Sequence, residues 1–152
     1  MKAIVPIVCN RENSHKSESN LEKELIQKRK KYSEIIFCAC PTHTNLSKLS
    51  AVAKNAGFQK IGLRFNTNTL NNNLIIQASK IGYSHLEVIL HNCTNNNPPT
   101  QNTIQTLIKT SNAGFNISAI IPINNQNKNT FLKTTQHLAQ NKIRKITIDC
   151  AF

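Results

Sequence analysis

The sequence has no tryptophan, few carboxylates and no long apolar run. Its 152 residues include 4 Gly and only 7 Asp or Glu, and Asp149 is the single Asp. So few carboxylates argue against paired-carboxylate chemistry of the glycosidase type and against oxygen-rich calcium or magnesium sites. No apolar run approaches the roughly 18 residues of a membrane-spanning helix. The apolar segment at residues 3–8 is too short for the core of a signal peptide. We therefore expect a cytoplasmic protein with an aliphatic core.

Length and charge narrow the class further. Residues 1–152 are expected to form one domain, since domains usually contain about 100–200 residues. Lys and Arg number 19, which gives a net charge of +12. Such an excess indicates a solvated basic face or an anionic partner. The 5 cysteines are odd in number and irregular in spacing, so free thiols or metal ligands are expected rather than a disulfide framework.

A recurrent junction runs along the chain at Gly57, Gly82 and Gly114. A helical pattern precedes each glycine, and an aromatic residue and a short apolar run follow it. Each glycine is expected to end a helix in the left-handed conformation, and each apolar run to form a strand buried on both faces. Residues 141–142 form a version of this junction without glycine. The assignment predicts that Gly57→Val destabilises the protein more than Gly62→Ala, because a β-branched residue in the left-handed region is strained.

The pattern predicts six strands that alternate with five helices. The predicted helices span residues 20–32, 46–56, 70–81, 99–113 and 130–140. The first and last strands span residues 3–8 and 145–150. Such alternation gives an α/β fold with a parallel sheet and right-handed crossovers. Two architectures fit: a six-stranded parallel partial (βα)6 barrel, TIM-barrel-like, or an open doubly wound sheet. We expect a protein or peptide partner at the open sheet edge or at the barrel mouth.

The cysteines fall where such folds place their sites. In parallel α/β proteins, sites form at the carboxyl ends of the strands. All the cysteines end or follow a predicted strand, namely Cys9, Cys38, Cys40, Cys93 and Cys150. Thiolates at one barrel mouth would suit zinc, an iron–sulfur cluster or copper. The alternative is that each cysteine is simply a small buried apolar residue.

Basic residues map to the opposite, amino-terminal end of the sheet. They follow the first predicted helix and precede the last strand, at Lys28, Arg29, Lys30, Lys31, Arg144 and Lys145. One interpretation is that they compensate helix dipoles on a solvated face. The other is that they bind an anion, such as RNA or an acidic peptide.

Several segments, taken in order, resemble the radical S-adenosylmethionine (radical SAM) superfamily, whose core is a six-stranded partial βα barrel. They are residues 35–42, 53–63, 67–70, 86–91 and 120–124. The similarity extends over residues 4–149. It implies a [4Fe–4S] cluster and S-adenosylmethionine as cofactors. It also implies that Ala39, Thr69 and Asn124 stand at cofactor-binding positions.

The signature residues of that family are missing. Its C-x-x-x-C-x-x-C cluster motif resembles this chain only at Cys9, since Asn13 and Lys16 stand at the next two positions. An amide and an ammonium cannot replace the thiolates that hold the irons. The family's Gly-Gly-Glu turn corresponds to residues 38–40 here, with Cys40 at the glutamate position, and Thr69 replaces a glycine.

These losses favour a non-catalytic protein. We expect a radical SAM pseudoenzyme, without catalytic residues or cofactor, that serves as a binding or accessory protein. One alternative is an active radical SAM enzyme whose rearranged iron–sulfur site uses the cysteines at the barrel mouth. The other is a basic nucleic-acid-binding module.

Overall fold

The computed structural model describes residues 1–6, 18–38, 45–90, 99–125, 127–129, 131–143 and 145–150. Strands and helices alternate along these residues. The strands are β1 (Lys2–Pro6), β2 (Glu34–Cys38), β3 (Lys60–Asn66), β4 (His85–Ile89), β5 (Asn116–Ile123) and β6 (Ile146–Cys150). The helices are α1 (Glu18–Arg29), α2 (Leu46–Asn55), α3 (Asn72–Ile81), α4 (Gln101–Asn112) and α5 (Phe131–Gln140). A 3-10 turn, η1 (Thr67–Thr69), follows β3.

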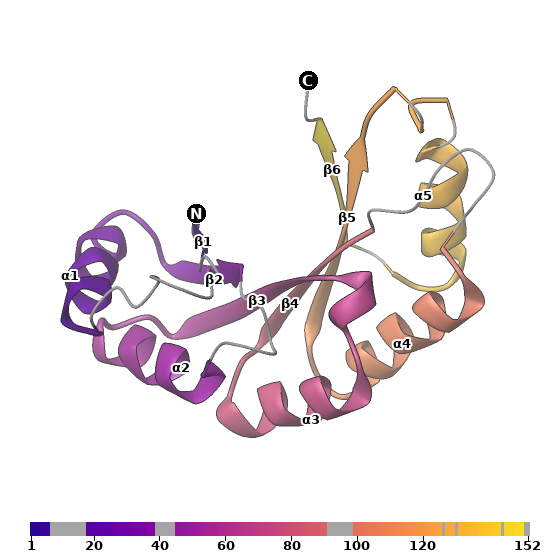
Figure 1. Cartoon of the computed structure of the whole chain (residues 1–152). Helices are drawn as coiled ribbons and strands as arrows, with labels where there is room; N and C mark the ends of the chain where they lie inside the picture. The colour runs from indigo at the N-terminus through magenta and orange to yellow at the C-terminus, as the bar shows by residue number, and fades with distance from the viewer. Residues whose placement is uncertain are drawn as a thin grey trace, which may run out of the picture.

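The six strands form one parallel sheet in the order β1-β2-β3-β4-β5-β6. Because each strand pairs with the next in sequence and all crossovers have the same hand, the helices lie on one side. Figure 1 shows them along the outer, convex side of a curled sheet. The predicted partial (βα)6 barrel is confirmed. The doubly wound alternative is wrong, since that fold reverses its strand order and carries helices on both faces.

The apolar core lies between the sheet and the helices. Alternate strand residues point to the helices, and the side chains of Phe37, Leu63, Leu86 and Ala119 are 0% exposed. The helices supply Leu25, Ala53, Ala78, Leu107 and Leu138, also 0% exposed. Because this core uses one face of the sheet, the intervening strand residues are left to line the concave face.

Four helices end in the same way. Gly57, Gly82 and Gly114 have φ angles of +90°, +94° and +90°, which confirms the predicted left-handed caps. Lys142 takes the equivalent position after α5 with φ 66°. The residue after each cap is buried against the core, namely Phe58, Tyr83, Phe115 and Ile143. This hydrophobic contact accompanies the left-handed cap and fixes where each chain segment turns toward its next strand.

Polar side chains set where the helices begin. Asn45, Asn71 and Thr100 each accept a hydrogen bond from a backbone N–H three residues on, at 3.0, 2.9 and 3.2 Å. These N-caps start α3 at Asn72 and α4 at Gln101, two residues after the predicted starts.

In the described residues, no helix combines the length and apolar character that a membrane span requires.

Gly62 is a different kind of glycine. It lies within β3, where a Cβ atom would stand 2.5 Å from Ile36 Cδ1 and 2.9 Å from the carbonyl oxygen of His85. The second contact is with backbone, which cannot rotate away. At Gly57 the nearest atoms are both in the Arg29 side chain, at 3.8 Å. The packing therefore adds a cost at Gly62 that the predicted ranking left out, while Gly57 keeps its left-handed strain at φ +90°, so the ranking stays a prediction.

Candidate functional site

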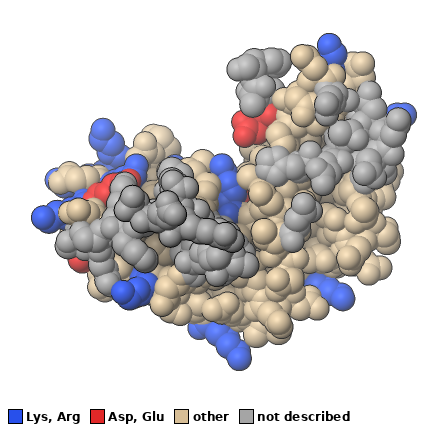
Figure 2. Space-filling view, viewed as in Figure 1, with Lys and Arg blue, Asp and Glu red and all other residues tan. Residues whose placement is uncertain are grey.

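A row of polar residues crosses the concave face of the sheet. Cys38, Arg64, Glu87 and Ser118 occupy matching positions on β2, β3, β4 and β5. Their neighbours in sequence pack against the helices, so these side chains point to the other face. Figure 2 shows the hollow between the two arms of the curled sheet, with Lys or Arg atoms at its base. This row is the candidate functional site.

Glu87 is the centre of the site. Its side chain is 0% exposed. Arg64 donates to Oε2 of Glu87 through Nε at 2.8 Å and Nη2 at 2.6 Å. Lys2 Nζ donates to the other oxygen, Oε1. A buried carboxylate is stable only when it is paired in this way, and both oxygens of Glu87 have cationic partners.

The cations decide the protonation of Glu87. Burial alone would raise the pKa of this carboxyl. The nearby His85 ring, hydrogen bonds from Lys2 and Arg64, and the charge of Arg64 together outweigh burial and hold the pKa of Glu87 well below its usual range. The carboxylate is therefore ionised at neutral pH. Since Lys2 and Arg64 carry two positive charges against one negative charge, the site keeps an excess of positive charge.

His85 and Ser118 lie beside Glu87 but do not form a catalytic triad with it. His85 Nε2 is 3.7 Å from Glu87 Oε1 and 3.5 Å from Ser118 Oγ. A triad needs the acid and the nucleophile on opposite ring nitrogens, and here both face the same one. Ser118 is also 0% exposed. Among these three residues, the geometry therefore provides no nucleophile that a base can activate.

Cys38 ends β2 next to Arg64 and is half-buried. Burial raises the pKa of its thiol above the ordinary value. Arg64 opposes this through its charge and a hydrogen bond, and Glu87 adds to it, so that the net shift is upward. The thiolate is the form that binds metals and attacks electrophiles. Cys38 is therefore a protonated thiol at neutral pH.

The predicted metal ligands are only partly described. Cys38 and Cys150 end β2 and β6, which confirms their placement at the carboxyl ends of strands, but three strands separate β2 from β6. Cys9, Cys40 and Cys93 lie outside the described residues. Among the residues that the structure describes, no three His, Cys, Asp or Glu side chains are grouped so as to hold a metal ion. The two described thiols, Cys38 and Cys150, do not by themselves supply the several thiolates that an iron–sulfur cluster needs, so the predicted metal site stays a prediction.

Two of the predicted cofactor positions are described, and both stabilise local turns. Thr69 Oγ1 donates to the carbonyl oxygen of Asn66 at 2.8 Å, within η1. Asn124 Oδ1 accepts from the backbone N–H of Asn127 at 3.2 Å, after β5. The buried Asn127 also donates a hydrogen bond from its Nδ2 to the Pro122 carbonyl oxygen at 2.7 Å. Asn13, Lys16 and Ala39 lie outside the described residues.

The predicted anion-binding residues divide into two groups. Arg29 Nε donates to the carbonyl oxygen of Gly57 at 3.0 Å, at the end of α2, and Lys28 Nζ lies 3.7 Å from Glu24 Oε1. Lys54, in α2, makes the equivalent contact with the end of α3, where its Nζ donates to the Ile81 carbonyl oxygen at 3.2 Å. These contacts support the helix-end interpretation for Arg29. The residues for which anion binding stays a prediction are Lys30, Lys31 and Lys145, which are exposed, and Arg144, which lies outside the described residues.

The sequence interpretation missed the residues at the centre of the site, Lys2, Arg64, His85 and Glu87. One signal was available. Glu87 interrupts the apolar run at residues 86–90, and a carboxylate within a buried strand requires cationic partners. The identity of those partners depends on the strand register and on the curl of the sheet, which sequence spacing does not give.

Comparisons with known proteins support the fold. No protein-family model matches the sequence, and a search of curated proteins finds no match. Among solved structures, coproporphyrinogen III oxidase (HemN) from Escherichia coli, a radical SAM enzyme, is similar with a TM-score of 0.62 and 12% identity. L-ribulose 3-epimerase is similar with a TM-score of 0.57 and 14% identity. The chain has a radical-SAM-like half-barrel fold.

The two alignments cover most of this chain and about half of each neighbour. They cover 97% of this chain and 43% of HemN, and 88% of this chain and 55% of the epimerase. At such identities the similarity concerns the fold alone. The activity of this chain must therefore be argued from its own residues.

Proposed function

We propose that this chain is a non-catalytic binding or accessory protein built on a radical-SAM-like half barrel. The concave face of the sheet is the surface that contacts its ligand or partner. The observation that carries the proposal is the network around Glu87. It fills the floor of the concave face with mutually paired charges, where an enzyme would hold an activated group.

The chemistry of the described residues supports a binding role. Cys38 is a protonated thiol, and His85 offers the same ring nitrogen to both Glu87 and Ser118. Thr69 and Asn124, at positions where the family resemblance implies cofactor contacts, are hydrogen-bonded within turns. In the sequence, Asn13 and Lys16 stand where the family has two cluster cysteines.

The charge of the site favours an acidic occupant. Arg64 remains partly exposed, with 18% of its side chain accessible, and Lys2 is exposed to 32%. Glu87 holds Arg64 from below, which fixes the direction of the guanidinium before a ligand binds. A fixed guanidinium is well suited to a carboxylate on a peptide or small molecule.

Titration calorimetry with S-adenosylmethionine tests the proposal. The protein is first incubated without oxygen with iron and sulfide, so that any cluster site can fill. We expect no saturable heat, and the same baseline for wild type and Cys38→Ala. Saturable binding that Cys38→Ala weakens would contradict the proposal and favour an active enzyme with a rearranged cluster.

A further inference from the structure

β6 is the last strand of the sheet and has one free edge. It pairs with β5 on one side, and no described residue pairs with its other side. Figure 1 shows β6 at the end of the curled sheet, next to the C-terminus. The carbonyl oxygen of Lys145, just before β6, accepts a hydrogen bond from the Ala119 N–H of β5 at 2.9 Å. Because backbone groups alternate along a strand, those of Ile146 and Ile148 point to the free edge.

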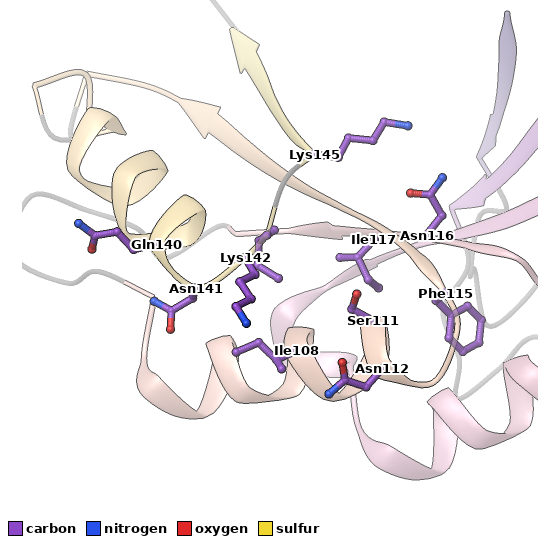
Figure 3. A pocket seen from close by; sticks show the side chains of 11 residues that line it. Ile108, Ser111, Asn112, Phe115, Asn116, Ile117, Gln140, Asn141, Lys142 and Lys145 are labelled. Atoms are coloured by element: carbon purple, nitrogen blue, oxygen red, sulfur yellow. The ribbon is translucent and has the colours of Figure 1, made fainter.

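The side chains of this segment divide between the two faces of the sheet. Ile146 packs against the core on the helix-covered face, and Ile148 belongs to the same face but is 44% exposed. Lys145, Thr147 and Asp149 alternate with them, belong to the concave face and are exposed. Figure 3, a close view of a hollow of about 620 Å³ beside the start of β6, shows the Lys145 side chain extending away from α5. The segment therefore has one apolar face and one charged face.

The sequence Lys145-Ile146-Thr147-Ile148-Asp149 is complementary to itself in the antiparallel direction. When Thr147 lies opposite Thr147 of a second copy, Ile146 lies opposite Ile148, and Lys145 lies opposite Asp149. Thr–Thr pairs and opposite-charge pairs are among the cross-strand contacts that stabilise antiparallel sheets. Centring the pair on Ile146 or on Ile148 instead would leave both charged side chains without an opposite charge. The side chains therefore select the register centred on Thr147.

The backbone is compatible with the same register. The outward groups of Ile146 and Ile148 supply the hydrogen-bonded pairs, in which opposite residues exchange both N–H···O bonds. Lys145 and Asp149 then form a non-hydrogen-bonded pair, whose Cα atoms are closer, at about 4.5 Å. Within one chain the same two residues are four positions apart along an extended strand, or about 13 Å. Among the ion pairs of the described residues, neither side chain takes part.

The first strand, at the other end of the sheet, lacks these features. β1 ends in Pro6, which has no N–H to donate, and proline is one of the residues that protect edge strands from pairing. The only charged side chain in β1 is Lys2, which already bonds Glu87. An antiparallel pair of β1 strands would therefore contain no acid–base contact. β6 contains no proline and no lysine.

We propose that two copies of this chain associate through β6, with the two strands antiparallel and Thr147 on the two-fold axis. Such an interface uses the same surface on both copies, so each side-chain contact occurs twice. The two sheets join into one, and the exposed Ile148 of each copy gains an apolar neighbour. The two concave faces then lie side by side along the joined sheet. This association does not depend on what the concave face binds.

Sedimentation equilibrium over a concentration series tests the association. The dimer fraction of the wild type is expected to rise with concentration. Lys145→Asp and Asp149→Lys should each weaken the dimer by about tenfold or more, because each replaces two opposite-charge contacts with two like-charge contacts. The double variant, Lys145→Asp with Asp149→Lys, should restore the dimer, because the facing charges are again opposite.

Lys80→Asp is the matched control for net charge. Lys80 is exposed at the end of α3, away from β6, so this variant should dimerise as the wild type does. Circular dichroism melts of dilute protein check that every variant is folded. Loss of the dimer in both single variants and its recovery in the double variant would support the proposal. A wild type that is monomeric at every concentration, or a dimer that the single variants leave unchanged or the double variant fails to restore, would overturn it.

Discussion

Lys2 on β1 donates a hydrogen bond to Glu87 on β4, although two strands lie between them in the sheet. Neighbouring strands are about 4.8 Å apart, so three spacings separate β1 from β4 by about 14 Å along the sheet. The two side chains meet because the sheet curls around its concave face. Arg64 on β3 pairs with the same carboxylate. The network thus links three strands and stabilises their curvature.

Glu87→Gln should strongly destabilise the protein. The amide removes the negative charge and leaves the Lys2 and Arg64 cations without a counter-charge on the floor of the sheet. Breaking a buried ion pair in this way costs about 3–5 kcal/mol. We expect a loss near the lower end of this range, because Lys2 is partly exposed. Urea unfolding followed by circular dichroism measures the change in the free energy of unfolding.

A double variant provides the control. Arg64→Met combined with Glu87→Leu replaces the buried pair with apolar side chains of similar size. It should destabilise the protein less than Glu87→Gln alone, because only the partly exposed Lys2 then lacks its counter-charge, whereas Glu87→Gln deprives both Lys2 and Arg64 of theirs. If the double variant were much less stable than the single one, the proposed cause would be wrong.

Stability should fall in acid because of Glu87. Its pKa is lowered in the folded state, so its stabilising contribution is complete above the unfolded value of about 4.3. This contribution is lost as the pH falls from that value toward the folded pKa. Chemical unfolding at several pH values between 6 and 3 should therefore show a slope that is smaller in Glu87→Gln. Equal slopes in the two proteins would contradict the assignment.

Gly62→Ala should be more harmful than Gly114→Ala. The added methyl group at Gly62 would overlap Ile36 and the backbone of His85, and such overpacking costs about 1–3 kcal/mol. At Gly114 nothing lies within 4 Å, so the cost is only that of the left-handed backbone, about 1–2 kcal/mol. Melting temperatures of both variants measure the difference. A larger loss for Gly114→Ala would contradict the packing around Gly62.

Arg29→Met should slightly weaken the end of α2. The guanidinium donates to the Gly57 carbonyl and lies 5.9 Å from the Phe58 ring. A cation at an exposed helix end stabilises by about 0.5 kcal/mol. Lys30→Met is the control, because Lys30 is exposed and makes no such contact among the described residues. Equal unfolding free energies for both variants would leave the helix-end role of Arg29 without support.

The fold could be predicted from local patterns. The glycines at 57, 82 and 114 mark helix ends, and the apolar runs after them mark buried strands, so the alternation of elements follows directly. The choice of a half barrel over a doubly wound sheet depends on strand order. That order is set by contacts between distant segments, and it entered the prediction only through the family resemblance.

The candidate site was less accessible to sequence reasoning. The positions of the cysteines predicted a site at the carboxyl ends of the strands. Of these cysteines, Cys38 lies at the end of β2, beside Arg64 of the candidate site. The ion-pair network unites residues that are 23 and 85 positions apart in sequence. No local pattern pairs Lys2 with Glu87, because their contact follows from the register of four strands and from the curvature of the sheet.

The most direct test of the central claim is metal analysis of the protein purified without oxygen. Iron and acid-labile sulfide are determined per chain, and the absorption spectrum is recorded. A non-catalytic half barrel should be colourless and contain no stoichiometric iron or sulfide. A brown protein with about four irons per chain, the content of a [4Fe–4S] cluster, would contradict the account.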